Sequence, residues 1–210
     1  MLHATSQPGA NQHRYQQMSG AFSRMALGVV SVLMLAACET KGGFHGIELD
    51  PPKPVPGFQF TRANRSIVRT DAEAGRPQLY FFGYTHCPDV CPTTLADWKR
   101  LKQALGDDAS RVRFFFVTVD PERDTPTIAE RYATQFDTTF VGLSGDSLTT
   151  SRIQDAFGVA SYHEGGTEPH AYFVSHSSQV FLVDGKGRIV AQYPFGIGWE
   201  ALRDDLKRFL

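Results

Sequence analysis

The chain has 210 residues, of which 41% are hydrophobic and 12% aromatic. This composition supports a packed domain, with or without appendages, and excludes disorder as the dominant state. The 21 basic residues balance 22 acidic ones, and the net charge of −1 excludes a protein whose main partner is the nucleic-acid backbone. Three cysteines are too few for a disulfide scaffold, but an odd number in an exported protein requires an explanation.

The start of the chain has the features of an export signal. Arg14 and Arg24 are the only charged residues before Glu39, and an apolar stretch over residues 25–37 follows them. At ~1.5 Å per residue this stretch is shorter than the ~30 Å hydrocarbon core of a membrane. Its end, LAAC, resembles the lipobox of bacterial lipoproteins. This resemblance implies cleavage before Cys38 and lipidation of its sulfur; a plain cleaved signal and a marginal membrane anchor are the alternatives.

The sequence therefore predicts three parts. We expect a lipoprotein signal peptide over residues 1–37, a lipid-anchored tether over residues 38–57 and the functional domain over residues 58–210. The tether is predicted because its segment is rich in glycine and proline and has no hydrophobic period. The domain is expected to be held at the cell membrane by the lipid, facing the periplasm or another extracytoplasmic space. Cysteines can oxidise there, which bears on Cys87 and Cys91.

Beyond residue 58, strand-like apolar runs alternate with helical patterns. The predicted elements are a strand over 78–84, a helix over 92–105, a strand over 112–119, helices over 127–136 and 148–157, a hairpin of strands 180–184 and 188–193, and a helix over 199–210. This order indicates an α/β fold whose central mixed sheet is flanked by helices, preceded by an N-terminal extension. A thioredoxin-like arrangement fits it.

The candidate chemistry is concentrated in the motif CPDVCP over residues 87–92. Because proline disfavours the α region for the preceding residue, we expect Cys87 and Cys91 on a loop, with Pro92 at the first helical position. Cys91 then lies near the N-cap, where the helix dipole favours a thiolate. A low-pKa thiolate suits both disulfide exchange and soft-metal ligation, and the motif leaves both open. An inert structural disulfide is the remaining alternative, although its short loop would stabilise little.

A soft-metal site with two cysteines usually recruits an imidazole. The candidates are His3, His13, His45, His86, His163, His170 and His176. The first two would leave with the signal, and the third lies in the expected tether. The fourth is adjacent to Cys87 and is expected to tune that thiol at most. The last three lie on or beside loops, where a solvated histidine is the usual case.

Three motifs spread over residues 83–188 resemble a known family. They are GYTHCPDVCPTTL, VDPERDTP and YFVSHSSQVFLVDGKGR. Together they are similar to the Sco/SenC family of copper-binding, thioredoxin-fold proteins, which help to build the copper centre of cytochrome c oxidase. The resemblance implies that Cys87, Cys91 and His176 ligate copper. Ser175 departs from the pattern, because the family commonly has an acidic residue there, and a hydroxyl holds an imidazole less firmly.

This ligand set has a definite chemical preference. Two thiolates and one imidazole suit Cu(I), the same set with an added oxygen ligand can hold Cu(II), and zinc usually has a fourth strong ligand. We therefore expect an extracytoplasmic copper metallochaperone rather than an enzyme. Its expected acceptor is the copper-binding subunit of cytochrome c oxidase, to which it delivers copper or whose cysteines it prepares. A thiol reductant or an upstream copper donor is a further expected partner, and nucleic acid is not.

Two alternatives remain at this point. A thiol–disulfide oxidoreductase or thiol peroxidase would use Cys87 and Cys91 as a redox pair, although thioredoxin-type exchange normally has two intervening residues rather than three. A purely structural domain would leave the motif without a purpose. In VDPERDTP we expect Asp124 or Thr125 to cap the next helix, and we interpret the motif as scaffold rather than as copper ligands. Asp89 is expected to be solvated.

Overall fold

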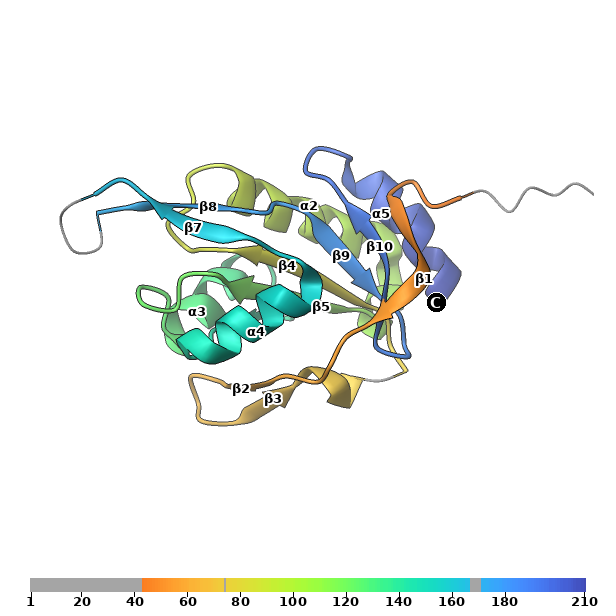
Figure 1. The fold of residues 1–210 in the computed structure, drawn as a ribbon. Helices are drawn as coiled ribbons and strands as arrows, with labels where there is room; N and C mark the ends of the chain where they lie inside the picture. Colours follow the sequence, from red (N-terminus) through yellow and green to blue (C-terminus); the bar gives the residue numbers. More distant parts are fainter. Residues whose placement is uncertain (1–42, 74, 167–170) are drawn as a thin grey trace, which may run out of the picture. The chain divides into compact units, whose positions relative to one another are not determined.

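A six-stranded mixed β-sheet forms the centre of the structure (Figure 1). The strands are β1 (Ile47–Pro54), β2 (Gln59–Thr61), β3 (Ile67–Arg69), β4 (Gln78–Gly83), β5 (Arg113–Thr118), β6 (Val141–Leu143), β7 (Ser161–Glu164), β8 (Phe173–His176), β9 (Val180–Val183) and β10 (Arg188–Tyr193). The computed structural model describes residues 43–73, 75–166 and 171–210. In the central sheet the order is β1-β10-β9-β4-β5-β6; β4, β5 and β6 run parallel, and the other neighbours pair antiparallel.

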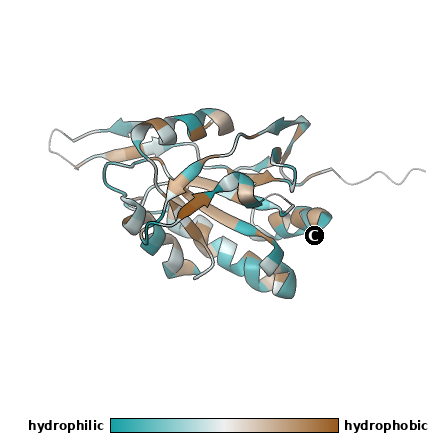
Figure 2. Ribbon diagram, turned by 90° about the horizontal axis from the view of Figure 1, so that it is seen from below, coloured by the Kyte–Doolittle hydropathy of each residue, from teal (hydrophilic) through white to brown (hydrophobic). Residues whose placement is uncertain are grey.

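Helices cover both faces of this sheet. They are α2 (Val90–Leu105), α3 (Pro126–Phe136), α4 (Ser147–Phe157) and α5 (Trp199–Leu206), with short 3-10 helices η1 (Thr70–Glu73), η2 (Gly106–Arg111) and η3 (Lys207–Phe209). Leu79 and Phe81 of β4 pack with α2, α3 and α5, whereas Tyr80 and Phe82 face α4 and β2. Because β4 is buried on both faces, its sequence is a continuous apolar run. Figure 2 shows apolar residues gathered on these central strands.

The predicted order of strands and helices is confirmed in the centre of the domain. Thr125 rather than Asp124 caps α3, because its hydroxyl accepts a hydrogen bond from the Ile128 amide at 3.4 Å. Pro126 then occupies the first turn, where a missing N–H costs nothing. The predicted hairpin is β9–β10. The predicted last helix is shorter than expected, since α5 ends at Leu206 and continues as η3.

The predicted tether is wrong over its second half. Residues 47–54 form β1, which pairs antiparallel with β10 at one edge of the sheet. The compact unit begins at Gly43 rather than near Phe58. His45, assigned to the tether, donates its backbone amide to the buried carboxylate of Asp205 at 2.8 Å, and its Nδ1 lies 2.9 Å from the same carboxylate. The lipidation predicted at Cys38 falls outside the described residues.

Three further strand pairings had no counterpart in the prediction. β2 and β3 form a short hairpin, β6 extends the parallel part of the sheet, and β7 pairs with β8 in a separate two-stranded sheet. The last pairing concerns the site directly, because β8 ends at His176. In the described part of the chain, no helix combines the length and apolar character needed to cross a membrane.

Candidate metal centre

The structure brings together the three residues implied by the sequence resemblance. Cys87 lies on the loop after β4, Cys91 in the first turn of α2 and His176 at the end of β8. One ligand atom from each lies within 4.8 Å of the other two. His176 Nε2 is 3.6 Å from Cys91 Sγ, and the Cys91 amide donates to Cys87 Sγ at 3.4 Å. Both cysteines are free thiols, so soft donors from two distant chain segments converge here.

Cys91 is helical, contrary to the expectation that it stays on the loop. Helix α2 starts at Val90 with Asp89 at the N-cap position, and Pro92 is therefore the third helical residue rather than the first. A proline is tolerated there because the first four N–H groups of a helix have no intrahelical acceptor. Cys91 is helical even though the following proline disfavours the α region for it. Cys91 is consequently fully buried, while Cys87 keeps partial exposure.

Close packing fixes the position of the buried sulfur. Gly83, the last residue of β4, leaves the space that Cys91 Sγ occupies, since a Cβ at Gly83 would lie 2.6 Å from it. The imidazole of His176 meets the ring edges of Phe81 and Tyr84, with ring centroids 6.1 and 5.8 Å away. Buried strand residues therefore define the walls of the site.

A backbone carbonyl sets the tautomer of His176. Its Nδ1 lies 3.0 Å from the carbonyl oxygen of Ser177, and a carbonyl can only accept, so Nδ1 carries the proton. Nε2 keeps its lone pair on the side of Cys91 Sγ. Metal-ligating histidines usually have such a partner on the other ring nitrogen. Ser175, the departure noted in the sequence, lies opposite Tyr162 in the β7–β8 pairing.

The two thiols have opposite acidities. The pKa of Cys87 is lowered to about 4, chiefly because Cys91 hydrogen-bonds its sulfur, and this outweighs the effect of partial burial. The pKa of Cys91 is raised, because its proton is held by Cys87 and because the group is buried. The low-pKa thiol was expected at Cys91, and that expectation is wrong. For the pKa of Cys91, the position at the start of the helix matters less than burial and the neighbouring sulfur.

The site is open on one side. A hollow of about 530 Å³ borders it, lined by Tyr84, Cys87, Val90, Ala160, Tyr162, Val174 and residues 175–178. Cys87 and His176 are both partly exposed, so a ligand from another molecule can reach them. In the described part of the chain, the group contains three candidate donor residues and no fourth. This set fits a three-coordinate Cu(I) ion better than a structural zinc ion.

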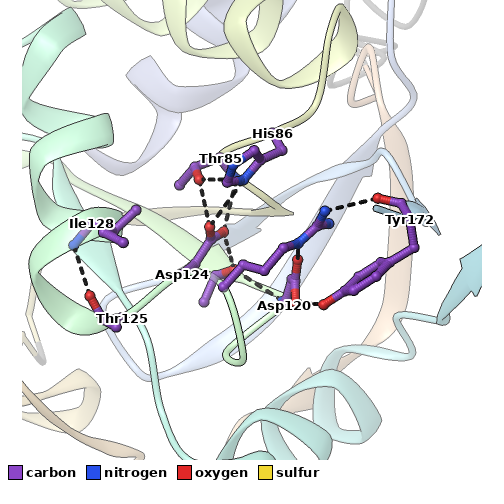
Figure 3. Close-up of polar contacts among 9 residues, drawn as sticks. Thr85, His86, Asp120, Asp124, Thr125, Ile128 and Tyr172 are labelled. Atoms are coloured by element: carbon purple, nitrogen blue, oxygen red, sulfur yellow. Dashed lines mark hydrogen bonds and ion pairs between the residues drawn. The ribbon is translucent and has the colours of Figure 1, made fainter. Parts of the chain in front are cut away.

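The VDPERDTP segment contacts the loop that carries Cys87. Asp120 and Asp124 are fully buried, and the Asp124 carboxylate accepts from the amide and hydroxyl of Thr85 at 2.8 and 2.5 Å. Thr85 lies two residues before Cys87, and Figure 3 shows its contacts with Asp124. The interpretation of the motif as scaffold agrees with these contacts. Sequence reasoning missed Thr85, and a hydroxyl beside the cysteine motif was the only available signal.

The other histidines have separate environments. The exposed His86 ring lies 3.9 Å from a carboxylate oxygen of Asp124, and His163 stacks on the ring of Tyr172 with centroids 4.3 Å apart. His163 was expected to be a solvated loop residue, but it lies in β7. His170 falls outside the described residues. Asp89 is exposed, as expected.

Comparison with known proteins decides the family. The family model SCO1/SenC matches residues 48–210. The chain belongs to the SCO1/SenC family. This SCO1/SenC protein is 30% identical to an SCO2-like protein of Rickettsia conorii over 175 residues, which cover 80% of this chain and 85% of the relative.

Two solved structures resemble this SCO1/SenC protein closely. Apo Sco1 from Thermus thermophilus is 37% identical with a TM-score of 0.74, covering 81% of this chain and 99% of that one. Copper-bound ScoI from Bradyrhizobium japonicum is 38% identical with a TM-score of 0.68, covering 75% and 99%. The predicted thioredoxin-like α/β fold with a central mixed sheet is confirmed.

Proposed function

We propose that this protein is an extracytoplasmic copper chaperone that carries its ion on Cys87, Cys91 and His176. The observation that carries the proposal is the convergence of two free thiols and one imidazole, with ligand atoms within 4.8 Å of one another and the imidazole Nδ1 on a backbone carbonyl. Copper is the cargo, and the soft donor set favours the monovalent ion. Family membership and the copper-bound ScoI structure support the same conclusion.

Each ligand has a distinct part in this function. Cys87 is a thiolate at neutral pH, so it offers the incoming ion a charged donor on the open side of the site. Cys91 releases its proton only when the ion binds, because a metal displaces the proton of its ligand. His176 comes from a separate segment and completes the set. The two partly exposed ligands can then be exchanged for those of an acceptor while Cys91 still holds the ion.

The proposed acceptor is the copper-binding subunit of cytochrome c oxidase, in line with the motifs shared with the family. Delivery of copper and reduction of that subunit's cysteines are both compatible with the site. We further propose that lipid on Cys38 holds the domain at the membrane, facing the periplasm or another extracytoplasmic space. Mass spectrometry of the membrane-extracted protein tests this, and an unmodified Cys38 would contradict it.

Titration of the reduced protein with Cu(I) against a competing chelator tests the central proposal. We expect one ion per chain and a tenfold or greater loss of affinity in His176→Ala. The matched control is His45→Ala, which removes an imidazole that lies beside Asp205, away from the cysteine motif, and should keep the wild-type affinity. Weak binding that does not respond to His176→Ala would refute the ligand set.

A second function is favoured by one observation, the low pKa of Cys87 beside a free Cys91 thiol. The Cys87 thiolate could attack a disulfide of the acceptor, forming a mixed disulfide and releasing one acceptor thiolate. Attack by Cys91 would then release the second acceptor sulfur as a thiolate and leave a Cys87–Cys91 disulfide. This reaction does not need an imidazole ligand. Disulfide reduction retained in His176→Ala and lost in Cys87→Ser would identify it.

A further inference from the structure

The strand that carries His176 is not hydrogen-bonded into the central sheet. β8 pairs only with β7, in a two-stranded sheet separate from the six-stranded one, and Figure 1 shows this hairpin reaching away from the central strands. An isolated two-stranded hairpin is marginally stable in water. Val174 anchors the middle of β8 in the hydrophobic core, but the start of the strand, where Phe173 is exposed, needs a further contact.

Tyr172 supplies that contact at the entrance to β8. Its hydroxyl donates to Asp120 Oδ1 at 2.8 Å, and its backbone carbonyl accepts from the guanidinium of Arg123 at 2.8 Å. The same guanidinium lies 3.8 Å from the centroid of the Tyr172 ring and forms an ion pair with Asp120. We call Asp120, Arg123 and Tyr172 the tyrosine clamp; Figure 3 shows the link from Tyr172 to Asp120.

The base of the tyrosine clamp is rigid. Asp120 is fully buried just after β5, and its amide donates to the hydroxyl oxygen of Thr118 at 3.0 Å. The Arg123 side chain is only 7% exposed, so its ion pair is shielded from water. Removal of one partner from a shielded pair leaves an uncompensated buried charge, which costs far more than the loss of an exposed pair. Movement of Tyr172 away from this base would leave buried charges with fewer partners.

The same turn also holds the cysteine loop. Asp124 lies next to Arg123 in the chain, and its carboxylate binds the amide and hydroxyl of Thr85 as well as the Thr118 hydroxyl. The amide of Asp124 donates to the carbonyl of Asp120 at 2.9 Å, which closes the turn. Residues 120–124 thus contact both ligand-bearing segments, although none of them is a candidate ligand.

We propose that Arg123 and Tyr172 are positioning residues, which hold the His176 strand against the cysteine loop and so set the copper affinity. This inference rests on the proposed copper-binding function. Removing an outer partner of a metal ligand typically costs 10–100-fold in affinity, and we expect a loss in this range for Arg123→Met. The loss should disappear in the His176→Ala background, because the tyrosine clamp acts through that histidine.

The experiment is a double-mutant cycle on the full chain, read out as Cu(I) affinity by chelator competition. The matched control is Arg113→Met, which removes another arginine–carboxylate pair, with Glu73 at 2.8 Å, and should leave copper affinity unchanged. The Cu(II)-loaded Arg123→Met protein should also have the thiolate-to-copper absorption band of His176→Ala. If Arg123→Met does not fold, Tyr172→Phe replaces it, since it keeps the ring and removes the hydroxyl bond to Asp120.

Hydrogen exchange of the metal-free protein separates this inference from the proposed function. Amides of β7 and β8 should exchange faster in Arg123→Met than in wild type or Arg113→Met, whether or not copper binds. Absence of Cu(I) binding by wild type would contradict the proposed function alone. Wild-type copper affinity in Arg123→Met, an equal loss in the His176→Ala background, or unchanged exchange of the hairpin would overturn the positioning role.

Discussion

Gly83→Ala is predicted to displace Cys91 Sγ, the buried donor of the proposed metal centre. A Cβ at this position would lie 2.6 Å from Cys91 Sγ and 3.1 Å from ring carbons of Phe81 and Phe116. The sulfur would have to retreat by about 0.8 Å to reach the 3.4 Å at which ordinary contact begins. It has little room, because Cys91 and both rings are fully buried.

The expected cost follows from overpacking. An extra carbon in a well-packed core typically costs about 1–3 kcal/mol, and the reduced entropy of the unfolded chain returns only ~0.4–1 kcal/mol when glycine becomes alanine. We therefore expect a net destabilisation of ~1 kcal/mol, and at most about 2.6 kcal/mol, in urea unfolding of the reduced protein. Copper affinity should fall at least tenfold, because the displaced sulfur no longer faces the other two ligands.

Two variants make this prediction specific. Gly43→Ala is the control, since a Cβ there has no heavy atom within 4 Å, and it should behave as wild type. In a Cys91→Ala background the sulfur is gone, so Gly83→Ala should cost clearly less stability than in wild type. An equal cost in both backgrounds, or wild-type copper affinity in Gly83→Ala, would refute the reasoning.

The remaining predictions concern acidity and the N-terminal segment. Iodoacetamide should alkylate Cys87 far faster than Cys91 at pH 7, as mass spectrometry can show, because only Cys87 has a lowered pKa. The pKa of Cys87 falls from 9.0 in the unfolded chain to about 4 in the folded one, so between these pH values only the unfolded chain holds the proton on this thiol. The stability that this group contributes is therefore complete above about pH 9 and is lost as the pH falls toward 4. Cys87→Ser should make the urea concentration at the unfolding midpoint less dependent on pH over this range. Asp205→Ala should destabilise the protein by about 2–4 kcal/mol in urea unfolding, because it leaves the amide of His45 and the buried hydroxyl of Tyr193 without their acceptor; a loss below 1 kcal/mol would contradict this.

The central strands could be predicted because burial on both faces leaves a clear trace in the sequence. β4 and β5 are continuous apolar runs, and the helices beside them keep an apolar period. β7 and β8 leave no such trace, since three of the four residues of β7 are exposed. β1 was not predicted as a strand because its prolines are typical of a linker.

The candidate site was predictable in part. Two cysteines at a strand-to-helix junction indicated sulfur chemistry, whereas His176 rose above the other histidines only through family resemblance. The link between Arg123 and Tyr172 joins residues 49 positions apart, and no local pattern reports such a contact. The acidity of the two thiols also depends on burial and mutual distance, which sequence does not contain.

The edge strand β1 has a consequence for association between copies of the protein. Exposed sheet edges can pair with one another and start aggregation. β1 carries Pro51, Pro52 and Pro54, which lack an N–H, and its register with β10 shifts between Glu48 and Lys53. It therefore covers the apolar strand β10 with a neighbour in which three of eight residues have no N–H to offer a further strand. This edge of the sheet is therefore a poor template for pairing with a second copy of the chain.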